Sequence, residues 1–369
     1  MRPNLWVVVP LLLVVVPAGK LWPADWQSEW KSTIASAKQE GNVVVGIPAQ
    51  SDLRKELPAI FEPQFGIKME LFAARGPSNA ARIASEFKAG LRYFDVYIGG
   101  SGTYDAFPYD GMAEEFMPYV ILPEVKDPKY WWGGHIWEDN IRTNRFLYSF
   151  IADAGTGSLW YNSDLAGAND FRSLDDLLKP KWKGKIALLD PRTPGAGQSL
   201  WSFFWDIKGE EYLNKLMKQE LIISRDQRLI ANALAKGSLA LGIGMSFYTL
   251  DPFIKSGLPV KQLPPPAEGL PTSNGSGVIG IVKNPPHPNA TKVFINWFLG
   301  KEGQTLYTKV MQQGTRRLDV DTKWMASVGN EAAKDALTIE QYHKLRNHLE
   351  DKYKAVRVPA AKFAEKILK

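Results

Sequence analysis

The sequence predicts an α/β protein of about two domains, and three observations lead to this prediction. Short apolar, β-branched runs alternate with amphipathic segments from residue 41 to residue 100. This alternation is typical of parallel strands joined by crossover helices. Several predicted strands end in loops rich in Gly, Ser and Pro. The length of 369 residues suits about two domains of ordinary size.

The first predicted elements form a regular series. We expect strands and helices in alternation at 41–47, 51–66, 67–74, 78–90 and 94–100. Ser51 and Ser78 stand where helix N-caps are expected, and Gly66 and Gly90 stand where the two helices should end. Strand, helix and strand in this order predict a parallel sheet with helices on its faces.

The rest of the chain is less regular but keeps the same mixture. We expect strands within 145–162 and at 186–190, 238–244 and 277–284, and helices at 198–207, 225–237 and 288–300. The segment 263–277 (LPPPAEGLPTSNGSG) is rich in Pro and Gly and is expected to be a connector. The charged tail from residue 331 is expected to be helical and to lie on the surface.

The N-terminus predicts export. Arg2 precedes the apolar run LWVVVPLLLVVVPAG at 5–19, whose 15 residues are fewer than the roughly 20 that a membrane-spanning helix needs. We therefore expect residues 1–24 to be a signal peptide and the protein to be periplasmic or extracellular. An uncleaved membrane anchor is the alternative.

Composition excludes several classes of function. There is no cysteine, so disulfides, thiolate metal sites and a cysteine nucleophile are absent. The net charge of +6 is mild and spread along the chain, so we expect no nucleic-acid binding. The four histidines form no metal-binding motif, and no nucleophile elbow or nucleotide-binding loop occurs. We expect neither catalysis nor a cofactor nor a bound metal.

Five loops at strand ends carry the prediction of a binding site. They are PAQS (48–51), RGPSN (75–79), GGSGT (99–103), PRTPGAGQ (191–198) and MSFYT (245–249). In a parallel sheet such loops gather at one edge, where ligands bind. Free N–H groups at a helix start attract anionic or carbonyl oxygens, and glycine lets a ligand approach the backbone.

These loops and the 263–277 connector supply the candidate ligand-binding residues. They are Gln50, Ser51, Arg75, Ser78, Ser101, Arg192, Gly195, Gly197, Gln198, Ser246, Tyr248 and Asn274. Arg75 and Arg192 are expected to pair with an anionic solute, and the loss of either should weaken its binding about tenfold. Surface arginines without a partner are the alternative. Tyr248 is expected either to contact the ligand or to pack in the core.

Four segments resemble a known family. SLWYNSDL (158–165), SLDDLLKPKWKGKIALLDPRTPGAG (173–197), ALAKGSLALGIG (233–244) and PPHPNATKVFINWFLGKEGQTLY (285–307) are similar to extracellular solute-binding proteins of ABC importers. The resemblance extends from about residue 38 to 325 and is closest to the iron(III)-type branch of the type II periplasmic binding fold.

The resemblance implies two α/β lobes with the ligand in a cleft between them. Lobe one would hold 41–147 and 277–325, lobe two would hold 148–276, and 326–369 would be a C-terminal helical segment. The chain would cross between the lobes near 146–154 and 273–281. Closure around a small polar, anionic solute would present a monomeric protein to a membrane permease.

One departure from the resemblance concerns iron. Ferric-binding members have two adjacent tyrosines after the strand that corresponds to 238–244, whereas this chain has Phe247 and Tyr248. The first loop also has no histidine. Tyr248 would be the metal ligand only in an iron-binding version. The alternatives are therefore a ferric-binding protein, or an enzyme or anchored sensory domain on the same fold.

Overall fold

The computed structural model describes residues 26–74, 76–100, 109–141, 145–155, 158–328 and 330–368, except the side chains of residues 77 and 248. The predicted signal peptide, Arg75 and Ser101 lie outside these ranges, as does the side chain of Tyr248. Across the described ranges, none of the helices is both long and apolar enough to cross a membrane.

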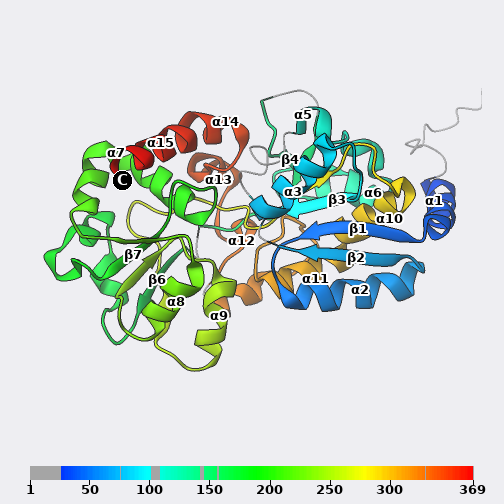
Figure 1. The fold of residues 1–369 in the computed structure, drawn as a ribbon. Coiled ribbons are helices and arrows are strands. Elements are labelled where there is room, and N and C mark those ends of the chain that lie inside the picture. Colours follow the sequence, from blue (N-terminus) through cyan, green and yellow to red (C-terminus); the bar gives the residue numbers. More distant parts are fainter. Residues whose placement is uncertain are drawn as a thin grey trace, which may run out of the picture.

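Two mixed sheets form two lobes (Figure 1). The sheet of lobe one has the order β2-β1-β3-β11-β5-β4, with β1 (Asn42–Ile47), β2 (Lys68–Ala73), β3 (Val96–Gly99), β4 (Ile136–Trp137), β5 (Leu147–Ser149) and β11 (Val278–Ile281). The sheet of lobe two has the order β10-β6-β9-β7-β8, with β6 (Leu159–Asn162), β7 (Ile186–Leu189), β8 (Ile222–Ser224), β9 (Leu241–Ile243) and β10 (Val260–Gln262).

Parallel pairing occurs where the sequence predicts it. Strand β1 pairs in parallel with β2 and β3, and β7 pairs in parallel with β8 and β9. The strands that return from the other lobe are antiparallel to their neighbours, as β11 is to both β3 and β5. The predicted α/β fold with two lobes is confirmed.

Helices cover both sheets. Lobe one carries α1 (Trp26–Glu40), α2 (Ser51–Phe65), α3 (Gly76–Lys88), α5 (Tyr109–Met112), α6 (Pro123–Lys126), α10 (Pro288–Leu299) and α11 (Lys301–Met311). Lobe two carries α7 (Ala196–Met217), α8 (Gln227–Ala235) and α9 (Phe247–Lys255). Short 3-10 turns occur at 117–119, 128–130, 168–171, 174–178, 180–182 and 323–328.

Several helix boundaries differ from the prediction. The side chain of Gln50, not Ser51, caps α2 by accepting the N–H of Asp52 at 2.8 Å. Helix α3 begins at Gly76, so Ser78 lies inside it and is exposed. Helix α7 continues beyond the predicted residue 207 to Met217, across a kink at Gly209, where φ is 76°. The amphipathic helix α1, which packs against α10, had not been predicted.

The C-terminal tail is more buried than its charge suggests. It contains α12 (Ala333–Ala336), α13 (Ile339–Leu345), α14 (Glu350–Lys352), a π-helical turn at 353–357 and α15 (Val358–Ile367). Figure 1 shows α15 beside α7 of lobe two. There the indole of Trp201 donates to the carbonyl of Ala360 at 2.9 Å, and Phe363 stacks on Trp201. The lysines of α15 are exposed, as expected of a tail on the surface, but the helix also buries an apolar face that its charge did not indicate.

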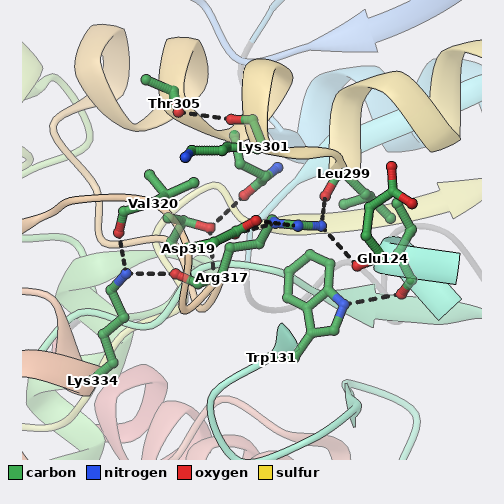
Figure 2. A network of polar contacts seen from close by, with 12 residues as sticks. Glu124, Trp131, Leu299, Lys301, Thr305, Arg317, Asp319, Val320 and Lys334 are labelled. Carbon is green, nitrogen blue, oxygen red and sulfur yellow. Dashed lines mark hydrogen bonds and ion pairs between the residues drawn. The ribbon is translucent and has the colours of Figure 1, made fainter. Parts of the chain in front are cut away.

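A buried polar network holds the return of the chain to lobe one (Figure 2). The side chain of Arg317 is fully buried, and its Nη1 donates to the carbonyls of Glu124 at 2.9 Å and Leu299 at 3.0 Å. Its Nε and Nη2 donate to the carboxylate of Asp319 at 2.8 and 2.7 Å. Lys334 of the tail donates to the carbonyls of Arg317 and Val320. This network fastens α6, the end of α10 and the tail to one another.

Candidate functional site

Three stretches of chain meet where the lobes join. Phe150 donates its N–H to the carbonyl of Gly277 at 2.8 Å, and Asp153 and Ser273 exchange N–H···O bonds of 2.7 and 3.2 Å. Ala152 completes the junction by donating its N–H to the carbonyl of Gly314 at 2.8 Å. These contacts pair the two predicted crossing segments with each other. They also join to them the segment after α11 that contains Gly314, which we call the return segment. We refer to residues 150–155 and 271–277 as the hinge segments.

A cavity of about 1420 Å³, counting the part that opens to solvent, lies between the lobes. Residues of all five predicted loops line it: Ala49, Gly76, Gly100, Gly195 and Ser246 are examples, one from each loop. The structure therefore brings these loops together from both lobes at one cavity, as the sequence analysis expected of them.

Lobe two presents two helix N-termini to this cavity. Gly195 is the N-cap of α7 and Ser246 is the N-cap of α9, and both residues line the cavity. Neither helix start has a capping side chain. The first N–H groups of a helix have no acceptor within the helix, and the helix dipole is positive at this end. Two uncapped helix starts therefore offer N–H donors to whatever occupies the cavity.

Glycine is needed at two points of the cavity wall. At Gly195 the backbone has a φ of 147°, which side chains rarely permit, and no atom lies within 4 Å of an added Cβ. At Gly100 an added Cβ would lie 2.4 Å from the carbonyl oxygen of Gly275, so only glycine lets this loop of lobe one approach the hinge segment. The first glycine keeps the start of α7 open, and the second lets the loop after β3 lie close to the hinge segment.

The other candidate residues lie elsewhere. Gln50 faces a second, smaller groove between α2 and α9, and Ser51 and Ser78 are exposed. Gly197 is buried, and an added Cβ there would lie 2.1 Å from the carbonyl oxygen of Leu189. Gln198 is buried inside α7.

Asn274 and Arg192 have partners within the protein. Asn274 is fully buried and donates to Oε1 of Glu138 at 2.8 Å. Arg192 donates to both carboxylate oxygens of Asp190 at 2.8 Å and to the carbonyl of Leu368 at 2.8 Å. Burial alone would raise the pKa of Asp190, but the hydrogen bonds from Arg192 and Arg225 lower it to about 2. A ligand-binding role for either residue stays a prediction.

Sequence reasoning missed the polar groups of the hinge wall and the tail. Asp153, Thr272 and Ser273 of the hinge segments line the cavity, as do Asn330 and His348 of the tail. The ring of His348 lies 3.2 Å from Oε1 of Glu138 and 3.0 Å from the hydroxyl of Tyr342, which fixes it in the wall. Burial raises the pKa of Asp153 to about 7.

Within the described residues, no three His, Asp or Glu side chains gather closely enough to hold a metal ion. The cavity is instead lined by backbone N–H groups, hydroxyls and one buried carboxyl group. Such a set suits hydrogen bonding to a polar organic molecule.

A two-lobed α/β molecule with loops from both lobes around one cavity belongs to the class of binding proteins that enclose a solute. The family model "Bacterial extracellular solute-binding protein" matches residues 50–305, and the chain belongs to this family. It is therefore a solute-binding protein of the kind that serves ABC import systems, and it is not an enzyme.

Similar proteins agree with the fold. An uncharacterized protein of Haemophilus influenzae is 28% identical over 289 residues, which are 74% of this chain and 77% of that protein. The periplasmic binding protein AfuA from Actinobacillus pleuropneumoniae, with fructose-6-phosphate bound, has a TM-score of 0.64 at 20% identity, covering 88% and 99% of the two chains. Iron-bound HitA from Pseudomonas aeruginosa has a TM-score of 0.66 at 15% identity, covering 88% and 98%.

Proposed function

We propose that this protein is exported, closes its lobes around a small polar solute that carries an anionic group, and delivers that solute to a membrane permease. The observation that carries the proposal is the pair of uncapped helix starts at Gly195 and Ser246, which line the same cavity. Converging N–H groups at helix N-termini favour phosphate or carboxylate oxygens.

The comparisons allow either an organic anion or iron, and the lining of the cavity is what favours the anion. AfuA holds fructose-6-phosphate, whereas HitA holds iron, so the fold accommodates both kinds of cargo. The described residues of the cavity offer hydrogen-bond donors rather than a cluster of acidic ligands. A phosphorylated or carboxylated metabolite is therefore the solute that we favour over Fe³⁺.

A thermal-shift comparison tests the anionic group. Fructose 6-phosphate, fructose, citrate, inorganic phosphate and Fe³⁺ are added separately to the mature protein. A probe present at 100 times its dissociation constant stabilises the fold by about 2.7 kcal/mol, which is visible as a rise in melting temperature. We expect a rise with at least one anionic probe and none with fructose. A rise with Fe³⁺ alone, together with a visible tyrosinate band, would replace this proposal with iron binding.

The variant Ala196→Pro tests whether the start of α7 holds the anion. Proline is tolerated at the first position of a helix but has no N–H, and Gly195 has no Cβ that would clash with the ring of a following proline. We expect the anionic probe to bind about tenfold more weakly because one charge-assisted hydrogen bond is lost.

A matched variant controls for the effect of proline itself. Lys301→Pro makes the same change at the first residue of α11, which is exposed and does not line the cavity. Affinity should be unchanged in this variant. Equal affinity in both variants would contradict an anion site at α7.

A further inference from the structure

The wall of the cavity formed by the hinge segments differs chemically from the wall formed by α7 and α9. Asp153 lies on one hinge segment and pairs with Ser273 of the other, and Thr272 precedes Ser273. Both Asp153 and Thr272 line the cavity. Both are buried, with 5% of Asp153 and none of Thr272 exposed. This wall therefore places a carboxyl group and a hydroxyl group, which can both donate and accept, beside the solute.

Asp153 receives fewer hydrogen bonds than a buried carboxyl group normally does. One of its oxygens accepts the N–H of Gly314 at 2.6 Å. Within the described residues, this is the one donor that the carboxyl group receives, and no cation there offsets its burial. Burial is accordingly the main cause of its raised pKa, with the Gly314 N–H acting in the opposite direction. A buried carboxyl group in this condition costs stability unless a further partner arrives.

Thr272, next to Ser273 on the other hinge segment, shows the same pattern. Its hydroxyl is buried and has no hydrogen-bond partner among the described residues. Buried hydroxyls are normally paired, so an unpaired one on a cavity wall points to a partner that comes from outside the protein. Two independent side chains of one wall are thus incompletely hydrogen-bonded in the same cavity.

We propose that Asp153 and Thr272 form a hydroxyl-recognition subsite, so that the solute is a polyhydroxylated organic phosphate. This inference rests on the proposed function, since it adds the second half of the solute to the anionic group held by lobe two. Solute hydroxyls donate to Asp153 and exchange hydrogen bonds with Thr272. A hydroxyl suits the Asp153 site because it can donate to a carboxylate and accept from a protonated carboxyl group.

The position of this subsite also links recognition to closure. Asp153 belongs to one hinge segment, pairs with Ser273 of the other, and accepts a hydrogen bond from Gly314 of the return segment. A solute that bonds to Asp153 and to the α7 start contacts the hinge and lobe two at once. Such a solute favours the arrangement in which the two walls lie at the right separation.

Two matched phosphates test the subsite. Glucitol 6-phosphate and n-hexyl phosphate have the same carbon chain and phosphate group but differ in their hydroxyls. Titration calorimetry of the mature wild-type protein should give an affinity for glucitol 6-phosphate at least about tenfold higher than for hexyl phosphate. Asp153→Asn keeps the shape of the side chain and an acceptor for Gly314, and it should weaken glucitol 6-phosphate about tenfold without weakening hexyl phosphate.

Two further variants separate recognition from a general loss of structure. Thr272→Val keeps the shape of the side chain and should also reduce the preference for the polyol. Asp139→Asn changes another buried aspartate, whose pKa burial raises to about 6 and which does not line the cavity. It should leave both affinities unchanged. A structural role for Asp153 would weaken both phosphates alike, which would overturn the subsite.

The remaining outcomes also decide the question. Equal wild-type affinities for the two phosphates would overturn the hydroxyl subsite and leave the anion proposal standing. If neither phosphate binds, the anion proposal fails, and titration with glucitol then tests the subsite alone. Binding of glucitol that Asp153→Asn abolishes would support the subsite, and the absence of such binding would overturn it.

Discussion

Two regions of the molecule bury polar side chains, and they satisfy them to different degrees. Around Arg317, four hydrogen bonds join one guanidinium to Asp319 and to two backbone carbonyls (Figure 2). In the cavity, Asp153 receives a single described donor and the hydroxyl of Thr272 receives none. A stable fold pairs its buried polar groups, so groups left incomplete at a cavity indicate where a solute belongs. We infer that the first region serves stability and that the second, as proposed above, serves recognition.

The largest effect on stability is expected from the replacement of Arg317. Arg317→Met leaves the carboxylate of Asp319 and the carbonyls of Glu124 and Leu299 without their donor. Asp319 is partly exposed, so water can replace the guanidinium at its carboxylate, whereas a buried carbonyl that loses its donor costs about 1–3 kcal/mol. We expect the free energy of unfolding, measured with urea, to fall by this order while the solute affinity of the folded protein is unchanged.

The control for Arg317 is an exposed cation of the following turn. Lys323→Met removes a positive charge from an exposed side chain and should change the free energy of unfolding by less than about 0.5 kcal/mol. If Arg317→Met were as stable as Lys323→Met, the network of Figure 2 would have no stabilising role.

The stability of the solute-free protein at different pH values tests whether Asp153 is incompletely hydrogen-bonded in the cavity. The pKa of Asp153 is about 7 in the folded protein, above its ordinary value of about 3.9. The folded state therefore binds a proton that the unfolded state has released, and stability falls as pH rises from about 4 to about 7. Burial is the main cause of the raised pKa of Tyr307 and of Tyr342, and the negative charge of Asp153 adds to it in both.

Asp153→Asn removes this penalty. At pH 8 the variant should be more stable than the wild type by at most about 4 kcal/mol, and the difference should disappear near pH 4. Melting temperatures of both proteins between pH 4 and pH 8 measure the effect. A difference that is the same at every pH would show that the carboxyl group is not held in the unfavourable state that the geometry indicates.

The two regions also differ in how far the sequence could predict them. The loops at strand ends were predictable because each depends on local signals, a run of β-branched residues and then a helix start, as at Ile47 and Gln50. Their meeting at one cavity follows from the parallel pairing of the strands. Gly195 could be placed near a helix start for the same reason, although α7 begins at Ala196, two residues before the predicted start at 198.

Asp153 and Arg317 could not be predicted from local signals. Asp153 lies in the segment FIADAG, whose sequence does not differ from that of an ordinary buried strand. The hydrogen bond to its carboxyl group comes from Gly314, 161 residues further along the chain. From the sequence, Arg317 would be expected on the surface, in a charged loop. In the structure it is buried, and it donates to the carbonyl of Glu124, 193 residues before it. Contacts at this separation are properties of the assembled lobes.

Arg192, which is partly exposed, gives the smallest expected effect and tests whether a side chain with a partner in the protein can also bind the solute. The sequence assigned it to the solute, whereas in the structure it binds Asp190 and Leu368. Arg192→Ala should cost about 1 kcal/mol of unfolding free energy, because Arg225 still donates to Asp190 at 2.9 Å. We expect the affinity for fructose 6-phosphate to change less than about threefold, as in the matched variant Arg225→Ala. A tenfold loss in Arg192→Ala alone would mean that Arg192 leaves Asp190 when the solute arrives, so that a paired group can also serve recognition.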